Sequence, residues 1–470
     1  MSTVRTQNLK NACRALERST DRTSTWRPVF HLAPVTGWLN DPNGLCQIGE
    51  THHIFFQYSP FDVKPGLNYW GHYTTEDFIH YQYCEPALCS AEKFDCHGVY
   101  SGSALGQDGT MYLFYTGNVL RRDREDYDYT TAGREHNTIR AESEDGLHFT
   151  KKTVLLYNED YPADLTCHVR DPKVWKDGDS FAMVLGARRK DDVGEVLVYR
   201  SDDLKAWTLA NRITSQKPFG YMWECPDYFE VSGKKIFSAS VQGLEGEAWK
   251  DRNVYQSGYF LVDGDLAGEY SLSAYRLWDY GFDYYAPQSF DTEDGRRIQI
   301  GWMGMPDCEE YTNRTIEDGW QHCFTFPREV FTENGVIKQR PVRELERRKT
   351  LFRETKNTLE EKEVSVCEID IDHIQQNQVY VELADDLVIG YEDGRFLMRF
   401  MNRMDGRVSC GRKIRYVETD CVTDVKILVD ESSVEVFVNN GEYVFSTRYY
   451  PEYPKISVRA GSADIRVFTL

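Results

Sequence analysis

Short runs of alternating apolar and polar residues recur from Trp26 to about residue 340. Four clear examples cover residues 53–58, 111–115, 181–185 and 196–199. Each run has the length of a β-strand, is rich in aromatic and branched residues, and is bounded by Gly, Asp or Pro. The pattern predicts a long series of short strands for this part of the chain.

A weak internal repeat runs through the same region. It consists of a hydroxyl residue, any residue, an aspartate, three further residues and an aromatic residue. Its copies begin at Thr75, Ser143 and Ser201, which are 68 and 58 residues apart. The hydroxyl group and the aspartate cap a turn, and the aromatic residue starts the next strand. A sheet of four short strands needs about 40–60 residues, so residues 28–340 would contain about five sheets, as in a five-bladed β-propeller. The alternative is coincidence among Asp-rich turns.

The two ends of the chain have other patterns. Residues 4–18 have the spacing of a short helix with one apolar face, made of Leu9, Ala12, Ala15 and Leu16. Residues 343–363 are charged and have no strong strand pattern, so we interpret them as a linker that could include some helix. Strand patterns return at 426–430 and 434–438, and the second run ends in the hairpin signal Asn-Asn-Gly. Glu435 is expected to point outward from this strand.

Length and charge limit the classes of function. The 470 residues suffice for two or three domains. Hydrophobic residues make up 41% and aromatic residues 14%, which allows a large core and excludes a disordered chain. The net charge of −20 argues against nucleic acid or an anionic membrane as a partner, because both bind basic surfaces. An anionic substrate would need a local basic pocket.

The N-terminus and the cysteines indicate the compartment. Residues 1–27 carry charges throughout and lack the apolar segment of a secretory signal. No stretch approaches the ~20 apolar residues of a membrane span. The twelve cysteines include no C-x-x-C pair, so a zinc site is not expected. Twelve thiols without a signal favour a reducing cytoplasm.

The segment W-L-N-D-P-N-G, from Trp38 to Gly44, is the most informative stretch of the chain. Pro42 has a fixed φ and Asn43-Gly44 tolerates left-handed dihedrals, so the segment predicts a rigid turn. Such a turn places the carboxylate of Asp41 beside an indole. An indole offers a sugar an apolar stacking face, the amide of Asn40 can bond hydroxyls, and a carboxylate can attack an anomeric carbon. The alternative is an ordinary β-turn in which Asp41 caps a backbone N–H.

Further short motifs follow in order: His72 in Y-W-G-H, Ser101 in Y-S-G-S, Asp171 in R-D-P and Glu224 in W-E-C-P. With the Trp38–Gly44 segment, this ordered set resembles glycoside hydrolase family 32, the β-fructofuranosidases. The resemblance extends from about His31 to the C-terminus. It implies an all-β fold, a five-bladed β-propeller followed by a β-sandwich with a similar S-V-E-V-F stretch.

We therefore divide the chain into four segments. They are an N-terminal helical extension at 1–27, a propeller catalytic domain at 28–342, a linker at 343–363 and a β-sandwich at 364–470.

The resemblance implies that two carboxyl groups act directly on the substrate. Glycoside hydrolysis with retention needs one group that attacks and one that donates a proton. By resemblance, Asp41 is the nucleophile that forms a covalent fructosyl-enzyme, and Glu224 is the acid/base. Apolar neighbours such as Trp223 favour the protonated form of a carboxyl group, which suits a proton donor. The alternative for Glu224 is a buried glutamate bonded to a backbone amide.

Asp171 is the third carboxylate of the implied catalytic set. The resemblance assigns it to the transition state, where it bonds hydroxyls of the fructose ring. The adjacent Arg170 is expected to keep it ionised. The alternative is a structural Arg–Asp pair at the end of a strand.

The resemblance also implies a set of substrate-binding residues. They are Trp38, Asn40, Gln57, Trp70, Tyr100, Ser101, Arg170, Asp283 and Gln288. The last two belong to the stretch D-Y-Y-A-P-Q and are expected near the pocket. The alternative for each is propeller packing or turn bonding. The family commonly has Asn-Pro where this chain has Ser59-Pro60, a change that affects substrate fit more than activity.

The implied activity is retaining hydrolysis of a terminal β-D-fructofuranosyl bond. A cytoplasmic location favours sucrose 6-phosphate or sucrose over polymeric fructan as the substrate. A phosphate would need nearby basic residues, and Arg188-Arg189-Lys190 is a candidate, although such a run is usually a solvated loop. The alternatives are a short-chain fructan hydrolase, a fructosyltransferase on the same site, and a non-catalytic fructoside-binding propeller. No cofactor and no metal is implied, and the sequence allows a homo-oligomer.

Overall fold

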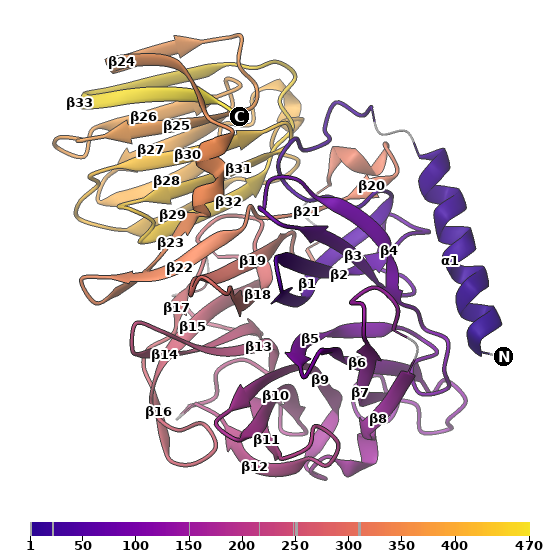
Figure 1. The fold of residues 1–470 in the computed structure, drawn as a ribbon. Helices are drawn as coiled ribbons and strands as arrows, with labels where there is room; N and C mark the ends of the chain where they lie inside the picture. The colour runs from indigo at the N-terminus through magenta and orange to yellow at the C-terminus, as the bar shows by residue number, and fades with distance from the viewer. Residues whose placement is uncertain are drawn as a thin grey trace.

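The computed structural model describes residues 2–20, 23–149, 151–215, 217–247, 249, 252–308 and 312–470. Residues 1, 21 and 22 of the predicted N-terminal extension lie outside the described residues. The fold is all-β apart from one helix, α1 (Ser2–Ser19), in the part of the chain that is described. As predicted, a five-bladed β-propeller is followed by a β-sandwich (Figure 1). Within these ranges no helix is long and apolar enough to cross a bilayer.

Each of the first three blades contains four antiparallel strands from one continuous stretch of chain. Blade 1 contains β1 (Gly37–Ile48), β2 (Thr51–Ser59), β3 (Tyr69–Thr75) and β4 (Gln82–Leu88). Blade 2 contains β5 (Val99–Gln107), β6 (Thr110–Leu120), β7 (Arg134–Ser143) and β8 (Lys151–Leu156), followed by the 3₁₀ turn η1 (Asn158–Asp160). Blade 3 contains β9 (Leu165–Asp177), β10 (Ser180–Arg189), β11 (Gly194–Ser201) and β12 (Thr208–Ile213).

The last two blades include shorter strands, and the fifth is joined to the first. Blade 4 contains β13 (Met222–Val231), β14 (Lys234–Gln242), β15 (Tyr255–Gly264), β16 (Tyr270–Leu272) and β17 (Arg276–Leu277). Blade 5 contains β18 (Tyr285–Asp291), β19 (Arg297–Met303), β21 (Cys323–Phe324), β22 (Arg328–Glu333) and β23 (Val336–Pro341). After the 3₁₀ turn η2 (Arg314–Ile316), β20 (Trp320–Gln321) pairs in parallel with Gly37 and Trp38. This pairing closes the ring.

The predicted sequence repeat is the turn between the third and fourth strands of blades 1 to 3. In each copy, the aspartate side chain accepts hydrogen bonds from the backbone N–H groups two and three residues ahead: Asp77, Asp145 and Asp203. The residue after each aspartate has a positive φ, between 56° and 70°. The repeat is therefore a shared turn structure and not a coincidence.

The C-terminal unit is a β-sandwich. One layer contains β26 (Val379–Leu383), β27 (Leu387–Glu392), β28 (Arg395–Phe400) and β29 (Ile414–Glu418), with the 3₁₀ turn η4 (Met404–Gly406). The other contains β25 (Cys367–Asp372), β30 (Val425–Asp430), β31 (Ser433–Val438) and β32 (Tyr443–Arg448). The long β33 (Ile456–Thr469) pairs with β26 through its first half and with β25 through its second, so it belongs to both layers. The predicted hairpin, with Asn439 and Asn440 at positive φ, connects β31 to β32.

Most of the predicted linker, residues 343–363, is a strand, and the prediction is corrected here. After the 3₁₀ turn η3 (Arg343–Arg347), β24 (Thr350–Glu361) pairs with β33 along its length. Nearly all of β24 is exposed, so it lacks the apolar alternation of a half-buried strand. Pairing with a strand about 100 residues away, and not the local pattern, forms this element.

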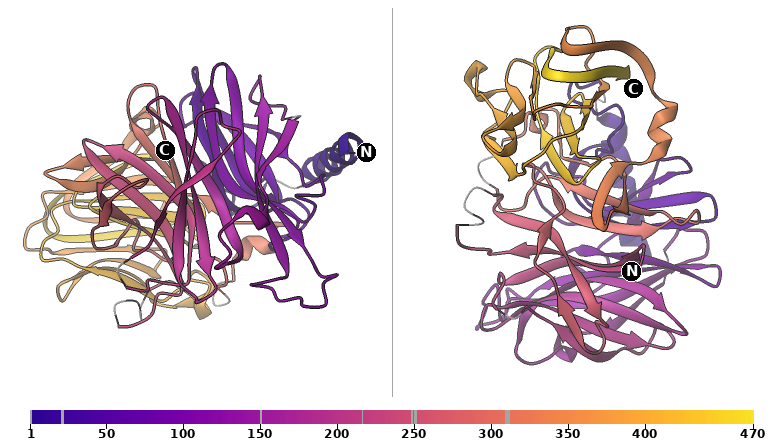
Figure 2. Two further views of the ribbon diagram at one scale, coloured as in Figure 1. Left: turned by 90° about the horizontal axis from the view of Figure 1, so that it is seen from below. Right: turned by 90° about the vertical axis from the view of Figure 1, so that its left-hand side faces the viewer.

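Helix α1 lies at the outer edge of the propeller (Figure 2). It buries a different face from the predicted one, because Ala12 and Ala15 are exposed while Glu17 is buried. The Glu17 carboxylate accepts hydrogen bonds from the hydroxyls of Tyr58 (3.1 Å) and Tyr83 (2.5 Å). A buried acid with two tyrosine donors therefore anchors the helix to blade 1, which apolar spacing alone does not predict.

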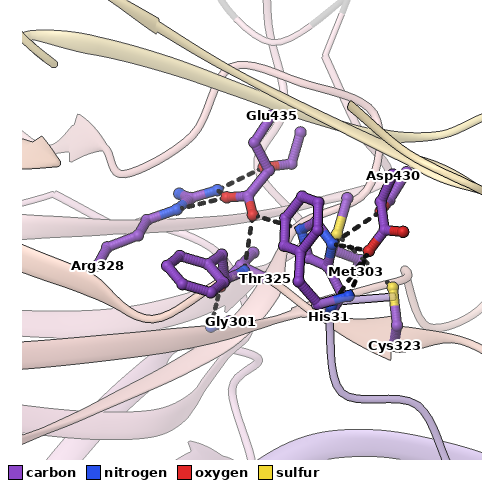
Figure 3. A network of polar contacts seen from close by, with 12 residues as sticks. His31, Gly301, Met303, Cys323, Thr325, Arg328, Asp430 and Glu435 are labelled. Atoms are coloured by element: carbon purple, nitrogen blue, oxygen red, sulfur yellow. Dashed lines mark hydrogen bonds and ion pairs between the residues drawn. The ribbon is translucent and has the colours of Figure 1, made fainter. Parts of the chain in front are cut away.

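A network of buried charges joins the sandwich to the propeller (Figure 3). His31 lies between two carboxylates, with Nδ1 2.8 Å from Asp430 Oδ2 and Nε2 2.8 Å from Glu435 Oε1. Arg328 donates to Glu435 through Nε (2.8 Å) and Nη2, and to Asp279 through Nη1 (3.0 Å). All five side chains are fully buried. Charges at this depth require partners, so the network fixes how the two units meet.

Glu435 does not point outward as predicted. Every residue of β31 is buried, since the propeller covers the face that alternation assigns to solvent. Burial raises the pKa of Glu435, but the charge of Arg328 and the hydrogen bond from His31 bring it below its ordinary value. Burial lowers the pKa of His31, but Asp430 and Glu435 bring it above its ordinary value. The network therefore favours an ionised Glu435 beside a protonated His31.

Candidate active site

The innermost strands of all five blades carry a bulge at equivalent positions. The pairing register with the neighbouring strand shifts between Leu39 and Pro42, Tyr100 and Gly102, Arg170 and Lys173, Glu224 and Asp227, and Tyr285 and Gln288. The first bulge residues Asp171, Cys225 and Ala286 have positive φ angles of 64°, 46° and 48°. A bulge redirects the side chains around it, and here every inner strand has one at this position.

One residue from each of these register shifts faces a common cavity of about 390 Å³. These residues are Asn40, Tyr100, Arg170, Glu224 and Tyr285. The bulge residues Asp41, Ser101 and Asp171 line the same cavity. The sequence prediction missed this shared position, although Pro172, Pro226 and Pro287 recur at 54 and 61 residues, which is blade spacing.

The structure brings together most of the predicted site residues. Nine of the twelve line the cavity: Asp41, Asp171, Glu224, Trp38, Asn40, Gln57, Tyr100, Ser101 and Arg170. They come from four blades and from motifs far apart in the sequence, so the ring as a whole forms the site.

Three predicted binding residues do not line the cavity. Trp70 is fully buried, and its Nε1 donates to the backbone carbonyl of Tyr100 (3.0 Å). Gln288 donates to a backbone carbonyl of β13 (3.0 Å). Asp283 forms an ion pair with Arg412 of the sandwich, with contacts of 2.6 Å and 2.7 Å. Their role is corrected from substrate contact to structural support: Trp70 and Gln288 bond the backbone of inner strands, and Asp283 joins the propeller to the sandwich.

Glu224 is fixed by three side-chain donors. Arg170 donates to Oε1 through Nε (3.0 Å) and Nη2 (2.6 Å). Gln242 Nε2 (2.8 Å) and the hydroxyl of Tyr285 (2.6 Å) donate to Oε2. Its partners are therefore side chains and not a backbone amide. Gln242 belongs to no motif, and nothing in the local sequence marks it as part of the site.

Arg170 is directed at Glu224 and not at the adjacent Asp171, contrary to the prediction. Asp171 accepts a hydrogen bond from the backbone N–H of Cys225 (2.9 Å) instead. Burial raises the pKa of Asp171, Arg170 opposes this shift, and Glu224 and Asp41 add to it, so the pKa reaches about 7. Arg170 therefore lowers the pKa of Asp171, as predicted, but it does not keep Asp171 fully ionised at neutral pH.

Asp41 lies in the same acidic cluster. Its Oδ2 accepts a hydrogen bond from the Ser101 hydroxyl (2.5 Å) and lies 3.7 Å from the Cys225 sulfur, which is 3.6 Å from Asp171. Burial raises the pKa of Asp41, the Ser101 hydrogen bond opposes the shift, and Glu224 adds to it. Carboxyl groups coupled in this way titrate as a set, so the cavity retains a proton near neutral pH.

The family assignment follows from comparison with known proteins. The model of the glycosyl hydrolases family 32 N-terminal domain matches residues 31–341, and that of the family 32 C-terminal domain matches residues 361–469. The chain belongs to glycoside hydrolase family 32. The resemblance inferred from the motifs is thereby confirmed.

Family 32 proteins of similar length cover nearly the whole chain. Sucrose-6-phosphate hydrolase of Bacillus subtilis is 37% identical over 90% of this chain and 89% of its own. Raffinose invertase of Escherichia coli is 36% identical over 95% of this chain and 94% of its own. The structure of a Bombyx mori family 32 β-fructofuranosidase mutant in complex with sucrose has a TM-score of 0.82 and 29% identity, and covers 98% of this chain and 96% of that one.

Only one residue of the run 188–190, the predicted candidate for binding a substrate phosphate, lines the cavity. Arg188 lines the cavity, with its guanidinium 4.5 Å from the centre of the Tyr221 ring. Arg189 pairs with Asp191 (2.6 Å), and Lys190 donates to a backbone carbonyl (2.7 Å). Neither of these two lines the cavity, so only Arg188 stays a candidate from the run.

Proposed function

We propose that this family 32 protein is a retaining β-fructofuranosidase that cleaves the terminal β-D-fructofuranosyl bond of sucrose 6-phosphate or sucrose. The observation that carries the proposal is the meeting of Asp41, Asp171 and Glu224, from three blades, in one cavity. Relatives named sucrose-6-phosphate hydrolase and raffinose invertase, and the structure of a related β-fructofuranosidase mutant in complex with sucrose, support it. We further propose a cytoplasmic location, where a phosphorylated sugar is retained.

Each carboxyl group has one role in the proposed reaction. Asp41, oriented by Ser101, attacks the anomeric carbon of fructose, and a covalent fructosyl-enzyme forms. Glu224, fixed by three donors, protonates the leaving oxygen and later removes a proton from the attacking water. Asp171 accepts hydrogen bonds from ring hydroxyls, which strengthen as positive charge develops on the sugar.

The proton of the acidic cluster gives substrate binding a further role. In the free cavity the pKa values of Asp171 and Asp41 are both raised, so these two groups share the proton, while Glu224 is paired with Arg170. Sugar hydroxyls that donate to Asp171 favour its ionised form, so substrate binding releases the proton for transfer to the leaving oxygen.

We expect kcat/KM to fall as the pH rises through about 7, the pKa of Asp171. Above this pH the free cavity loses the proton that the leaving group needs, and kcat/KM reports the free enzyme. Asp171→Asn should lower the rate and move this alkaline limb to lower pH, because removal of one carboxylate lowers the pKa of the acids that remain in the cluster. The check is a profile on sucrose from about pH 5 to 9. An alkaline limb that Asp171→Asn leaves in place would contradict the assignment.

The function is tested by product formation from sucrose and from sucrose 6-phosphate. Release of fructose from either sugar supports a β-fructofuranosidase, and added methanol should give methyl β-D-fructofuranoside, because a covalent intermediate retains configuration. The α-anomer would exclude the covalent mechanism. No turnover of either sugar would reject the proposal and favour a fructoside-binding propeller.

A further inference from the structure

The cavity wall formed by blade 2 contains a buried cation without an acidic partner. Arg134, at the start of β7, lines the cavity and is 6% exposed. Among the described residues it forms no ion pair with Asp or Glu, and its Nε has no hydrogen-bond partner. Its guanidinium lies over the Tyr129 ring at 4.0 Å, and its Nη1 is 3.3 Å from His136 Nε2. A buried charge without a counter-charge is costly, so this position is suited to an anion.

His168 of β9 adds a second unused donor at this wall. It lines the cavity and is 5% exposed. Its Nδ1 lies 2.7 Å from Arg170 Nη1, and because a guanidinium only donates, Nδ1 must accept. The proton of the neutral ring is therefore on Nε2, which has no partner among the described residues.

Three guanidinium groups surround His168. Burial lowers the pKa of His168, and the charges of Arg170, Arg134 and Arg188 lower it further, to about 2 in all. Arg170 is neutralised by Glu224, and Arg188 is paired with Asp192, which is largely exposed. The guanidinium groups around His168 therefore form a local region of positive charge at the cavity wall, in a protein whose net charge is −20.

We propose that Arg134, His168 and Arg188 bind a phosphate monoester of the substrate. This inference rests on the proposed function, because a phosphorylated fructoside is one of its two substrates. Phosphate oxygens would accept from Arg134 Nε, from His168 Nε2 and from Arg188 Nη1, because Nε and Nη2 of Arg188 already donate to Asp192. Arg170 bonds both His168 and Glu224, so it places the phosphate site beside the acid that serves the leaving group.

The preference for the phosphorylated sugar is the direct test. We compare kcat/KM on sucrose 6-phosphate and on sucrose for the wild type, Arg134→Gln, Arg188→Gln and Arg134→Lys. Loss of one charge-assisted hydrogen bond should lower the preference for the phosphorylated sugar at least ~10-fold in each Gln variant. Arg134→Lys should recover part of it, because it restores the charge. Arg189→Gln is the matched control, since Arg189 does not line the cavity, and it should keep the wild-type preference.

A wild type without preference for sucrose 6-phosphate, or Gln variants that lose both activities equally, would overturn the phosphate site and leave the proposed function intact. Calorimetry with glucose 6-phosphate and glucose separates the two proposals, because it needs no turnover. Tighter binding of the phosphorylated sugar that Arg134→Gln abolishes supports the site even when neither sugar is hydrolysed. Inorganic phosphate that binds there without improving recognition of the sugar would indicate a free-phosphate effector and reject the substrate assignment.

Discussion

Asp41→Asn will reduce kcat on both sugars by about five orders of magnitude, because loss of a nucleophile removes the covalent route. The variant keeps nearly the same volume and can still accept the hydrogen bond from Ser101. Its fold and its substrate affinity should therefore persist. The measurements are the initial rate of fructose release and the binding of sucrose by calorimetry.

Two control variants test whether the loss of kcat in Asp41→Asn comes from the missing nucleophile. Ser101→Ala only removes a donor to Asp41, so it should cost about 10-fold to 100-fold. Asp307→Asn changes another carboxylate that lines the cavity and should cost less than about 10-fold. If Asp41→Asn retains more than about 1% of the wild-type kcat, a nucleophilic role for Asp41 is excluded.

Glu435→Gln will destabilise the folded protein by about 3 kcal/mol, because it leaves His31 and Arg328 short of a buried counter-charge. The substitution preserves shape, so the loss reports charge and not packing. The measurement is the first transition of urea-induced unfolding, monitored by fluorescence.

An exposed ion pair provides the control for Glu435→Gln. Glu418 lies 3.5 Å from Arg395, and both side chains are largely open to solvent. Glu418→Gln should change the free energy of unfolding by less than about 0.5 kcal/mol. Equal effects of the two substitutions would contradict a structural role for the buried network.

The pH dependence of stability follows from the same network. The pKa of His31 is raised, so its contribution is complete below about pH 6.5, its unfolded value, and is lost as the pH rises through the folded value. The pKa values of Asp430 and Glu435 are lowered, so their contributions are present above about pH 4.5 and are lost as the pH falls through the folded values. The wild type should be most stable between these limits, and Glu435→Gln should reduce the dependence.

Local interactions could be predicted from the sequence, and long-range ones could not. The blade turns around Asp77, Asp145 and Asp203 follow from hydrogen bonds within three residues. Strand β24 depends on pairing with β33, which leaves no local pattern. Glu435 was misassigned because alternation identifies two faces of a strand but not what covers each face.

In the site, too, local features could be predicted from the sequence and long-range ones could not. Short motifs around bulges revealed Asp41, Asp171 and Glu224, because Pro and Gly mark an irregular backbone. A motif does not reveal whether a side chain faces the cavity or the blade, which explains the misplacement of Trp70 and Gln288. The donors Gln242 and Arg134 lie in ordinary strand sequence and reach the cavity only through the ring.

The prolines of the inner strands also affect self-association. Strands β5, β9, β13 and β18 have a paired neighbour on one side only, so each is an open sheet edge. Open edges invite addition of another extended chain, and a bulge with a residue that has no N–H interrupts the pairing that addition needs. Pro172, Pro226 and Pro287 thus prevent another strand from pairing with the free edges of β9, β13 and β18. A sugar binds without pairing to strand backbone, so these prolines exclude an unfolded polypeptide from the cavity and still allow a sugar to enter.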